Sequence, residues 1–352
     1  MRIYKAKEDD RLDPRIKSLL SALEYARPAI TDVPDRETLL LESNSFKEKA
    51  KMKLLEGILN KADTEAIAPS DGLMIKTLCF YSSPDNNEIK IQWIRPDNDD
   101  VLPCIYYIHG GGMQFMSCFW GNYRAWGKIL AKQNLAVAMV DFRNCVVPSS
   151  APDVAPFPAG LNDCVSGLKW ISEKSGELKV DSQNIFIAGE SGGGNLSIAT
   201  TMKIVRDEKN NTLIKGLYAL CPYIAGIWPL EKNPSSIENE GILLTLANNR
   251  GAMAYGIEEL KNENPLAWPG FATQNDVIDF PPTMISVNEC DPLRDEGVNF
   301  YRLLSSSGVR AQCRQVMGTP HGLEIFPSVC PDISRQTARD LAGWIEEIRN
   351  HC

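Results

Sequence analysis

Residues 184–195 decide the fold, and they read NIFIAGESGGGN. An apolar run leads into the pattern G-x-S-x-G, which spans Gly189 to Gly193, and a helical segment follows it. A strand, a sharp turn and a helix in this order expose a serine hydroxyl at the end of a sheet. Glycines beside the turn let the strand and the helix approach closely, because they carry no Cβ. The stretch therefore predicts a nucleophile at Ser191, and the alternative is an ordinary glycine-rich turn that binds phosphate or nothing.

Strand-like runs alternate with helical segments on both sides of this turn. The runs at 103–108 and 135–141 are continuously apolar, which is typical of strands buried on both faces. The alternation predicts an α/β fold with a mostly parallel central sheet and helices on both faces. We expect strands at 75–81, 88–94, 103–108, 135–141, 184–189, 214–221, 283–288 and 311–317, and helices at 120–133, 157–174, 193–206, 293–307 and 332–349.

Two segments stand outside this alternation. Residues 1–70 are charged, and their apolar residues repeat at the spacing of a helix face. Residues 223–281 lie between two strands and are too long for a simple connection. We expect 1–70 to be an N-terminal helical cap segment and 223–281 to be a cap insertion, which divides the catalytic core into 71–222 and 282–352. A solvated two-helix extension is the alternative for the N-terminal segment, and the sequence leaves both open.

A glycine loop, His109-Gly110-Gly111-Gly112, follows the strand at 103–108. Consecutive glycines let backbone N–H groups turn toward a ligand oxygen, and fixed N–H donors stabilise the oxyanion of an acyl-transfer intermediate. We expect the donors to be Gly110 and Gly111, together with Gly192 after the nucleophile. His109 is expected to support the loop by hydrogen bonding, and the alternative is a flexible glycine hinge.

A serine hydroxyl needs a base beside it, and the chain has 3 histidines. His351 is next to last and is expected beyond the final helix, while His109 belongs to the glycine loop. His321 remains, in the loop Gly318-Thr319-Pro320-His321-Gly322 after a strand, where a catalytic histidine is expected. The sequence therefore predicts His321 as the general base.

The base needs a carboxylate that fixes its tautomer. Chain order in this kind of fold is Ser, then Asp or Glu, then His. Asp291 lies just past the strand at 283–288 and is the predicted acid, with a helix N-cap as its alternative role. Asp295 and Glu296 follow in the first helical turn, where acids are favoured by the helix dipole alone.

Large apolar side chains follow the glycine loop, and ordinary packing is the alternative to a pocket role for them. The predicted substrate-pocket residues are Met113, Phe115, Phe119, Trp120 and Tyr123.

The composition excludes several classes of partner. The 352 residues carry a net charge of −8, which argues against nucleic acid and against an anionic membrane. No apolar stretch is long enough to span a bilayer, and the N-terminus is too charged for a signal peptide, so we expect no membrane span and a cytoplasmic location. The 10 cysteines form no CxxC pair, so we expect no metal and no other cofactor. A homodimer stays open.

These motifs resemble the hormone-sensitive-lipase family of α/β-hydrolases. The resemblance lies in HGGG at His109, GESGGGN at Gly189, DPLRDE at Asp291 and the PHG that ends at Gly322, and it covers about residues 103–325. It implies the α/β-hydrolase fold with a helical cap, the Ser, Asp and His triad named above, and a small-molecule ester as substrate.

The implied activity is that of a serine carboxylesterase acting on short- to medium-chain esters, with lactones left open. A non-catalytic small-ligand receptor on the same fold, or an amidase or acyltransferase with the same triad, is the alternative. The chain departs from many family members at Glu190, where Asp or Thr is usual, and at Gly192, where Ala is usual. We expect Glu190 to be a buried hydrogen-bonding carboxylate behind the nucleophile, and a tolerated substitution is the alternative.

Overall fold

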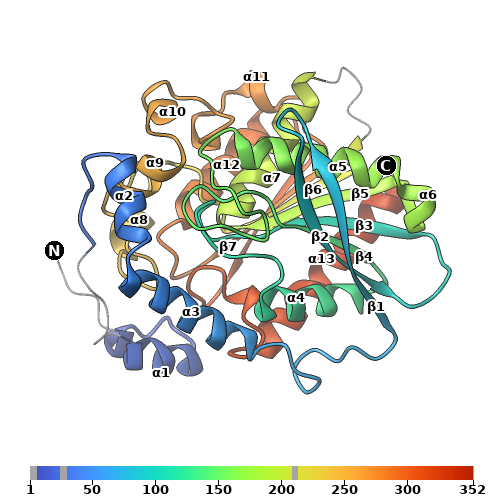
Figure 1. Ribbon diagram of the computed structural model, residues 1–352, viewed down its shortest axis with the longest axis horizontal. Coiled ribbons are helices and arrows are strands. Elements are labelled where there is room, and N and C mark those ends of the chain that lie inside the picture. The colour runs from blue at the N-terminus through green and yellow to red at the C-terminus, as the bar shows by residue number, and fades with distance from the viewer. Residues whose placement is uncertain (1–5, 24–29, 208–212, 352) are drawn as a thin grey trace.

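A computed structural model describes residues 6–23, 30–207 and 213–351 of the chain. Its centre is an eight-stranded sheet with the strand order β1-β2-β4-β3-β5-β6-β7-β8 (Figure 1). The strands are β1 (Leu73–Ser82), β2 (Asn87–Pro96), β3 (Leu102–Ile108), β4 (Ala136–Val140), β5 (Val180–Glu190), β6 (Gly216–Leu220), β7 (Thr283–Asn288) and β8 (Ala311–Val316).

The sheet is mostly parallel, as the sequence predicts. β1 pairs with β2 and β2 pairs with β4 in the antiparallel sense, and each other pair of neighbours is parallel. The carboxyl ends of β3, β5, β6, β7 and β8 therefore meet at one edge, where ligands bind in open α/β sheets.

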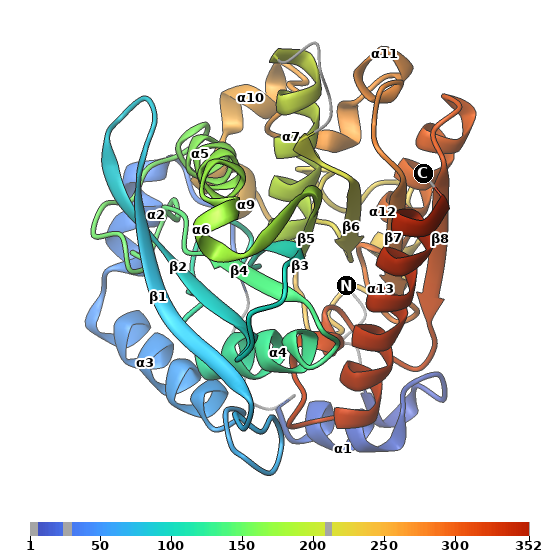
Figure 2. The same cartoon turned by 90° about the vertical axis from the view of Figure 1, so that its right-hand side faces the viewer.

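Helices cover both faces of the sheet (Figure 2). Along β3, Ile105 and Tyr107 pack in one apolar cluster with α4 and α13, whereas Tyr106 and Ile108 pack in the other with α5 and α7. This alternation explains why the strand is apolar throughout. The helices of the core are α4 (Gly121–Ala131), α5 (Ala159–Glu173), α6 (Ser175–Leu178), α7 (Gly192–Asp207), α12 (Arg294–Ser306) and α13 (Pro331–His351).

The described residues of the N-terminal segment form three helices rather than two. They are α1 (Pro14–Leu23), α2 (Arg36–Ser43) and α3 (Phe46–Asn60), after a short 3-10 turn η1 (Ala6–Glu8). Ser45 separates α2 from α3 because its hydroxyl caps the N-terminus of α3. Residues 1–5 and 24–29 of the expected cap segment lie outside the described residues.

The insertion at 223–281 consists of short helices, with no strand among its residues, all of which the structure describes. It packs against the N-terminal segment: the Asn249 side chain bonds the backbone of Val33 in both directions, and Arg250 pairs with Glu42 at 2.6 Å. Two segments far apart in the sequence therefore meet on one side of the sheet. The short helices are α8 (Ser235–Glu238), α9 (Arg250–Tyr255), α10 (Ile257–Lys261), η4 (Pro269–Phe271) and α11 (Gln274–Val277).

Within the described ranges, no helix has both the length and the apolar character needed to cross a bilayer. The nine cysteines described there are unpaired thiols, and of these Cys79 is exposed. The last helix extends to His351, so the expectation that this histidine lies beyond the helix is wrong.

Candidate active site

Ser191 lies at a sharp turn between the end of β5 and the start of α7. Its backbone φ is +57°, in the left-handed region that side-chain-bearing residues rarely adopt. The turn is possible because α7 approaches β3 very closely: a Cβ on Gly193 would lie 2.0 Å from the carbonyl oxygen of Ile108. A strained serine in this position matches the geometry of a nucleophile elbow.

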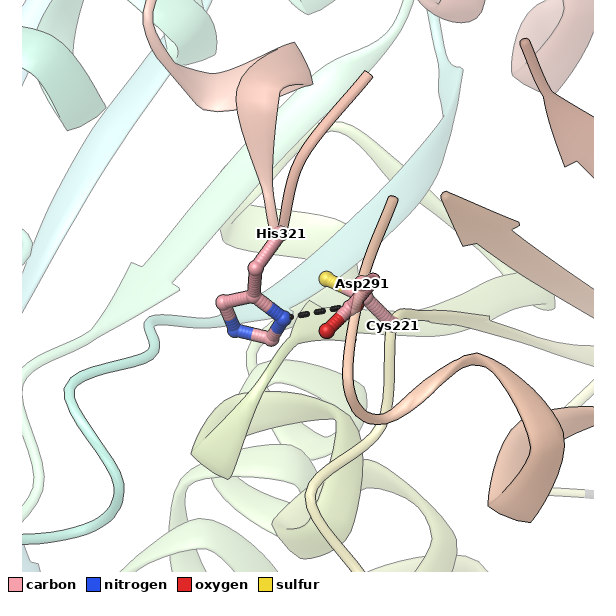
Figure 3. A group of neighbouring side chains, drawn as sticks. All are labelled: Cys221, Asp291 and His321. Carbon is pink, nitrogen blue, oxygen red and sulfur yellow. Dashed lines mark hydrogen bonds and ion pairs between the residues drawn. The ribbon is translucent and has the colours of Figure 1, made fainter. Parts of the chain in front are cut away.

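His321 and Asp291 meet at the same edge of the sheet (Figure 3). Nδ1 of His321 lies 2.8 Å from Oδ2 of Asp291, and both side chains are buried. The second carboxylate oxygen accepts the N–H of Leu293 at 2.9 Å. Asp291 therefore binds the imidazole and also closes the turn before α12, but the N-cap of that helix is Leu293, so Asp291 does not take the helix-cap role considered as its alternative.

Nε2 of His321 is buried and has no hydrogen-bond partner among the described residues. The hydroxyl of Ser191 makes no hydrogen bond to this nitrogen in the structure. The two are linked through β6: the N–H of Ser191 donates to the carbonyl of Leu220 at 3.0 Å, and the next residue, Cys221, lies against His321. Catalytic hydrogen bonds are often long before substrate binds, so this geometry is compatible with a nucleophile and its base.

Cys221 is a third side chain in this group that the sequence analysis did not assign to the site. Its Sγ and one donor atom each from Asp291 and His321 lie within 4.8 Å of one another (Figure 3). A metal ion could use such a spacing, but here the imidazole and the carboxylate are joined directly by a hydrogen bond. Burial raises the pKa of the Cys221 thiol to about 11, which keeps it protonated at neutral pH.

The electrostatics of His321 reflect two opposing effects. Burial lowers its pKa, because the charged imidazolium is poorly solvated inside the protein. The adjacent Asp291 carboxylate raises its pKa, and the net pKa lies well above the ordinary value of 6.5. Asp291 therefore favours the protonated imidazole, which is the form that a base reaches after it accepts a proton.

Glu190 joins the elbow to the glycine loop. Its Oε1 accepts the N–H of Gly110 at 2.6 Å and the hydroxyl of Tyr123 at 2.5 Å, and its Oε2 accepts the hydroxyl of Tyr107 at 2.6 Å. Burial raises the pKa of Glu190 to about 7, although these three donors act in the opposite direction. The expected buried carboxylate behind the nucleophile is therefore present.

The expectation that Gly110 belongs to the oxyanion hole is wrong in this structure, because its N–H is already bonded to Glu190 and Tyr123. The N–H groups of Gly111 and Gly112 have no acceptor among the described residues. A Cβ on Gly192 would lie 2.8 Å from the nitrogen of Gly112, so these two backbones are in close contact. The arrangement brings Gly111, Gly112 and Gly192 together beside the nucleophile.

His109 is buried beneath the glycine loop and stacks on Phe142, with ring centroids 4.3 Å apart. Its Nδ1 lies 3.0 Å from the carbonyl oxygen of Gly110, and since a carbonyl only accepts, this nitrogen carries the proton. Burial lowers the pKa of His109, which favours the neutral ring. These contacts suit the supporting role expected for it.

A cavity of about 990 Å³ opens beside this site, between α3, the loop at 146–148 and the insertion. It reaches Tyr223, whose N–H donates to the carbonyl of Ser191 at 3.0 Å, and Phe115, whose N–H donates to the carbonyl of Gly111 at 3.3 Å. Two residues that line the cavity are therefore backbone neighbours of the nucleophile and of the glycine loop, although Ser191, His321 and the glycines of that loop do not line it themselves.

Of the five predicted pocket residues, Phe115 lines the cavity and the others do not. Tyr123 is fully buried and its hydroxyl is bonded to Glu190, and Met113 is buried in the core. Phe119 and Trp120 pack against the apolar cluster below α4. The prediction is wrong for Met113 and Tyr123, because a run of apolar residues does not reveal which side chains turn toward the core; for the half-buried Phe119 and Trp120 a pocket role stays a prediction.

Glu296 has a role beyond the helix-dipole effect expected for it. Its carboxylate accepts the N–H groups of Ile224 and Ala225, at 2.7 and 3.1 Å, and the indole N–H of Trp228 at 2.7 Å. Burial raises the pKa of Glu296 to about 8. Glu296 thus holds the loop after β6, which carries Tyr223 to the cavity, and no local sequence signal predicts such a long-range contact.

Comparisons with known proteins agree with this geometry. The family described as the α/β hydrolase fold matches residues 105–325. Carboxylesterase NlhH of Mycobacterium tuberculosis is 30% identical over 266 residues, which cover 75% of this chain and 79% of that protein.

Two solved structures are similar over nearly the whole chain. Esterase Est22 is 58% identical, with a TM-score of 0.93, and the match covers 97% of this chain and 99% of that one. Brefeldin A esterase, a bacterial homologue of human hormone-sensitive lipase, is 31% identical, with a TM-score of 0.84, and the match covers 98% of this chain and 96% of that one.

Proposed function

Because this chain belongs to the α/β-hydrolase fold family and is a carboxylic-ester hydrolase, we propose that Ser191, His321 and Asp291 perform its reaction through an acyl-enzyme. The single observation that supports this most directly is the 2.8 Å contact between His321 Nδ1 and Asp291 Oδ2. It leaves the other ring nitrogen without a hydrogen-bond partner among the described residues, and Ser191 directly follows the last residue of β5. A base oriented in this way is what a serine nucleophile requires.

The reaction follows from these roles. Oγ of Ser191 attacks the ester carbonyl while Nε2 of His321 accepts its proton. The imidazolium, stabilised by Asp291, then gives this proton to the leaving alcohol oxygen as the C–O bond breaks. Water, deprotonated by His321, attacks the acyl-enzyme, and the carboxylic acid leaves as Ser191 regains its proton.

The oxyanion is bound by the N–H groups of Gly111, Gly112 and Gly192. Gly111 and Gly112 are supported by the lack of any acceptor for their N–H groups within the described residues, and Gly192 by its contact with the nitrogen of Gly112. Gly110 acts indirectly, because its bond to Glu190 ties the loop to the nucleophile elbow. Removal of one such donor costs about 3 kcal/mol of transition-state stabilisation.

The substrate is a short- to medium-chain carboxylic ester, and lactones fall within the same chemistry. The cavity that Tyr223 and Phe115 line supports this, since about 990 Å³ holds a small or medium-sized organic molecule. The described residues of 1–70, together with 223–281, form a cap over the cavity. The contacts of Asn249 with Val33 and of Arg250 with Glu42 support their assignment to one cap.

A non-catalytic receptor on the same fold is the alternative from a different class. The paired His321 and Asp291 speak against it, because a receptor has no need of an oriented base. An amidase or an acyltransferase with the same triad differs only in the leaving group or the acceptor. Three further points stay predictions: no nucleic-acid partner, a cytoplasmic location and a possible homodimer. Sedimentation tests the homodimer, and cell fractionation tests the location.

The test is the labelling of the full chain by an organophosphate. One phosphoryl group should attach to Ser191, and the Ser191→Ala variant should stay unlabelled and lose roughly 10⁴- to 10⁶-fold in kcat. Ser197→Ala is a matched control in the same helix, since its hydroxyl only bonds the carbonyl of Gly193. Labelling of Ser191→Ala to the wild-type level would exclude this nucleophile. A panel of p-nitrophenyl esters, a lactone and an amide separates the alternative substrates.

A further inference from the structure

Helix α3 lies on the outside of the molecule and has no buried residue along its 15 positions (Figures 1 and 2). It packs against α2 and α4, and Asn60 at its end accepts the N–H of Gly121 at 2.7 Å. Its inner face carries the half-buried Met52 and Leu55, which line the cavity beside the active site. The helix therefore forms one wall of the cavity mouth and leaves its other face to solvent.

The outer face of α3 is apolar along its centre. The Phe46 side chain is 90% exposed, Leu54 is 66% exposed and Ile58 is 54% exposed. At about 100° per residue, these positions and the exposed Ala50 fall within one third of the helix circumference. Large exposed apolar side chains gathered on one helix face mark an interaction surface.

Lysines border this stripe on both sides. By the same angular spacing, Lys49 and Lys53 lie beside one edge and Lys51 lies beside the other, whereas Lys47 lies within the stripe, and all four are exposed. The two acidic residues of the helix, Glu48 and Glu56, are half-buried and lie on the inner face. Lys51 pairs with Glu48 at 2.6 Å. The Glu48 side chain is itself 43% exposed, so the exposed charges of α3 are mostly rather than entirely positive, on a chain whose net charge is −8.

We propose that the outer face of α3 docks on the anionic surface of a phospholipid bilayer and so places the mouth of the cavity at the lipid. A helix with an apolar stripe bordered by lysines lies in the plane of a bilayer interface, with its apolar side chains among the acyl chains. The lysine side chains extend past the stripe and keep their ammonium groups at the anionic headgroups.

The charge pattern favours this occupant over a second copy of the chain. A two-fold symmetric contact would bring the same lysines against one another, and like charges oppose such an interface. The acidic remainder of the molecule does not prevent docking at physiological ionic strength, because charges more than about 8 Å apart are largely screened. The net charge argued against an anionic membrane as partner, but the local distribution on α3 decides the contact.

Docking goes beyond ester hydrolysis and does not depend on Ser191. It would let esters dissolved in the bilayer enter the cavity without crossing water. Binding and catalysis are therefore separable, and the binding experiment uses the full-length Ser191→Ala variant so that no lipid is hydrolysed.

The experiment is flotation of this protein with vesicles of phosphatidylcholine alone or mixed with phosphatidylglycerol. The protein should float with the mixed vesicles and much less with the neutral ones. Phe46→Ala/Leu54→Ala should reduce the bound fraction strongly. Lys49→Glu/Lys53→Glu should weaken partitioning by at least about 25-fold, roughly fivefold for each lysine lost. Turnover of a short water-soluble ester by Phe46→Ala/Leu54→Ala on the Ser191 background should stay unchanged, since neither side chain lines the cavity.

Two control variants carry the same kinds of substitution at exposed positions outside α3. Ile237→Ala/Ile278→Ala removes two other exposed apolar side chains, which are 58% and 57% exposed. Lys232→Glu/Arg349→Glu reverses two other exposed charges. The proposal is overturned if the protein does not float, if it floats equally with neutral vesicles, or if the controls lose as much binding as the α3 variants. It is also overturned if the α3 variants instead convert a dimer into a monomer in sedimentation, since α3 would then be a contact between copies.

Discussion

Glu190 accepts the N–H of Gly110 at 2.6 Å, and this bond ties the residue before the nucleophile to the first glycine of the loop on the next strand. The contact is tight: a Cβ on Gly110 would lie 2.3 Å from Oε1 of Glu190. The N–H of Gly110 is occupied by this bond, whereas the N–H groups of Gly111 and Gly112 have no acceptor among the described residues. The loop is thus positioned by a carboxylate that takes no direct part in the proposed chemistry.

Replacement of Glu190 tests this positioning role. Glu190→Ala removes the closer of the two acceptors of the Gly110 N–H and leaves the buried hydroxyl of Tyr107 without its acceptor, at a penalty of about 1–3 kcal/mol in stability. We expect kcat to fall by roughly 10- to 100-fold, because a small displacement of the glycine loop misplaces the oxyanion donors. Steady-state kinetics with a soluble ester would measure the change.

Glu190→Gln keeps an acceptor oxygen and should restore most of this activity. Tyr107→Phe removes only the donor to the other carboxylate oxygen and should stay within about threefold of wild type. Equal damage from Gln and Ala would mean that the charge of Glu190, rather than its bond to Gly110, is what matters.

The Asp291→Asn variant should fold but lose on the order of 10⁴-fold in kcat, with little change in KM. An asparagine amide can donate to Nδ1 of His321, which would then place the ring proton on Nε2 and prevent that nitrogen from acting as a base. Circular dichroism checks the fold, and Asp295→Asn is a control on the same helix–loop segment. An Asp291→Asn enzyme with near wild-type turnover would remove Asp291 from the triad.

The pH dependence of kcat/KM should follow the protonation of His321. The imidazole must be neutral to accept a proton, so activity is lost as the pH falls through the pKa of His321. From an unperturbed histidine alone, the expected midpoint would be roughly 6–7. The Asp291 carboxylate shifts the pKa upward, so the measured midpoint should lie above 6.5.

The Asp291→Asn variant offers the matching measurement on its residual activity. Without the carboxylate, the lowering effect of burial remains, and the midpoint should move to a lower pH than in the wild type. A midpoint that does not change would show that another group controls the profile.

Two glycine substitutions should change the free energy of unfolding in opposite directions, because one glycine lies where α7 contacts the sheet closely and the other has open space around it. Gly193→Ala would place a Cβ 2.0 Å from the carbonyl oxygen of Ile108 and 2.6 Å from that of His109. Both are backbone atoms that cannot move aside, so we expect a loss of more than about 3 kcal/mol in the free energy of unfolding.

Gly343→Ala in α13 is the control, because nothing lies within 4 Å of the added Cβ. It should raise the free energy of unfolding by about 0.5–1 kcal/mol, since alanine is the better helix former. Urea denaturation of both variants provides the comparison, and a Gly193→Ala protein as stable as wild type would contradict the close packing.

Patterns between neighbours in the sequence predict most of the fold. The apolar run at 184–189 and the glycines after it identify a strand, a turn and a helix, and β5 and α7 lie there. Strand and helix periodicity are short-range properties of the chain, so they can be interpreted without coordinates. The boundary between α2 and α3 was harder to predict from the sequence, because it depends on a single residue, Ser45, whose hydroxyl caps α3.

The sequence by itself determined the order of the strands and helices and the residue types available for acyl-transfer chemistry, because both follow from local patterns. Only the tertiary structure decided that Asp291 reaches His321, that the N–H of Gly110 is bonded to Glu190, and that Cys221 lies beside the imidazole. These contacts join residues that are distant along the chain. Their geometry depends on how the sheet twists and on which backbone groups are already satisfied, and no local pattern encodes either property.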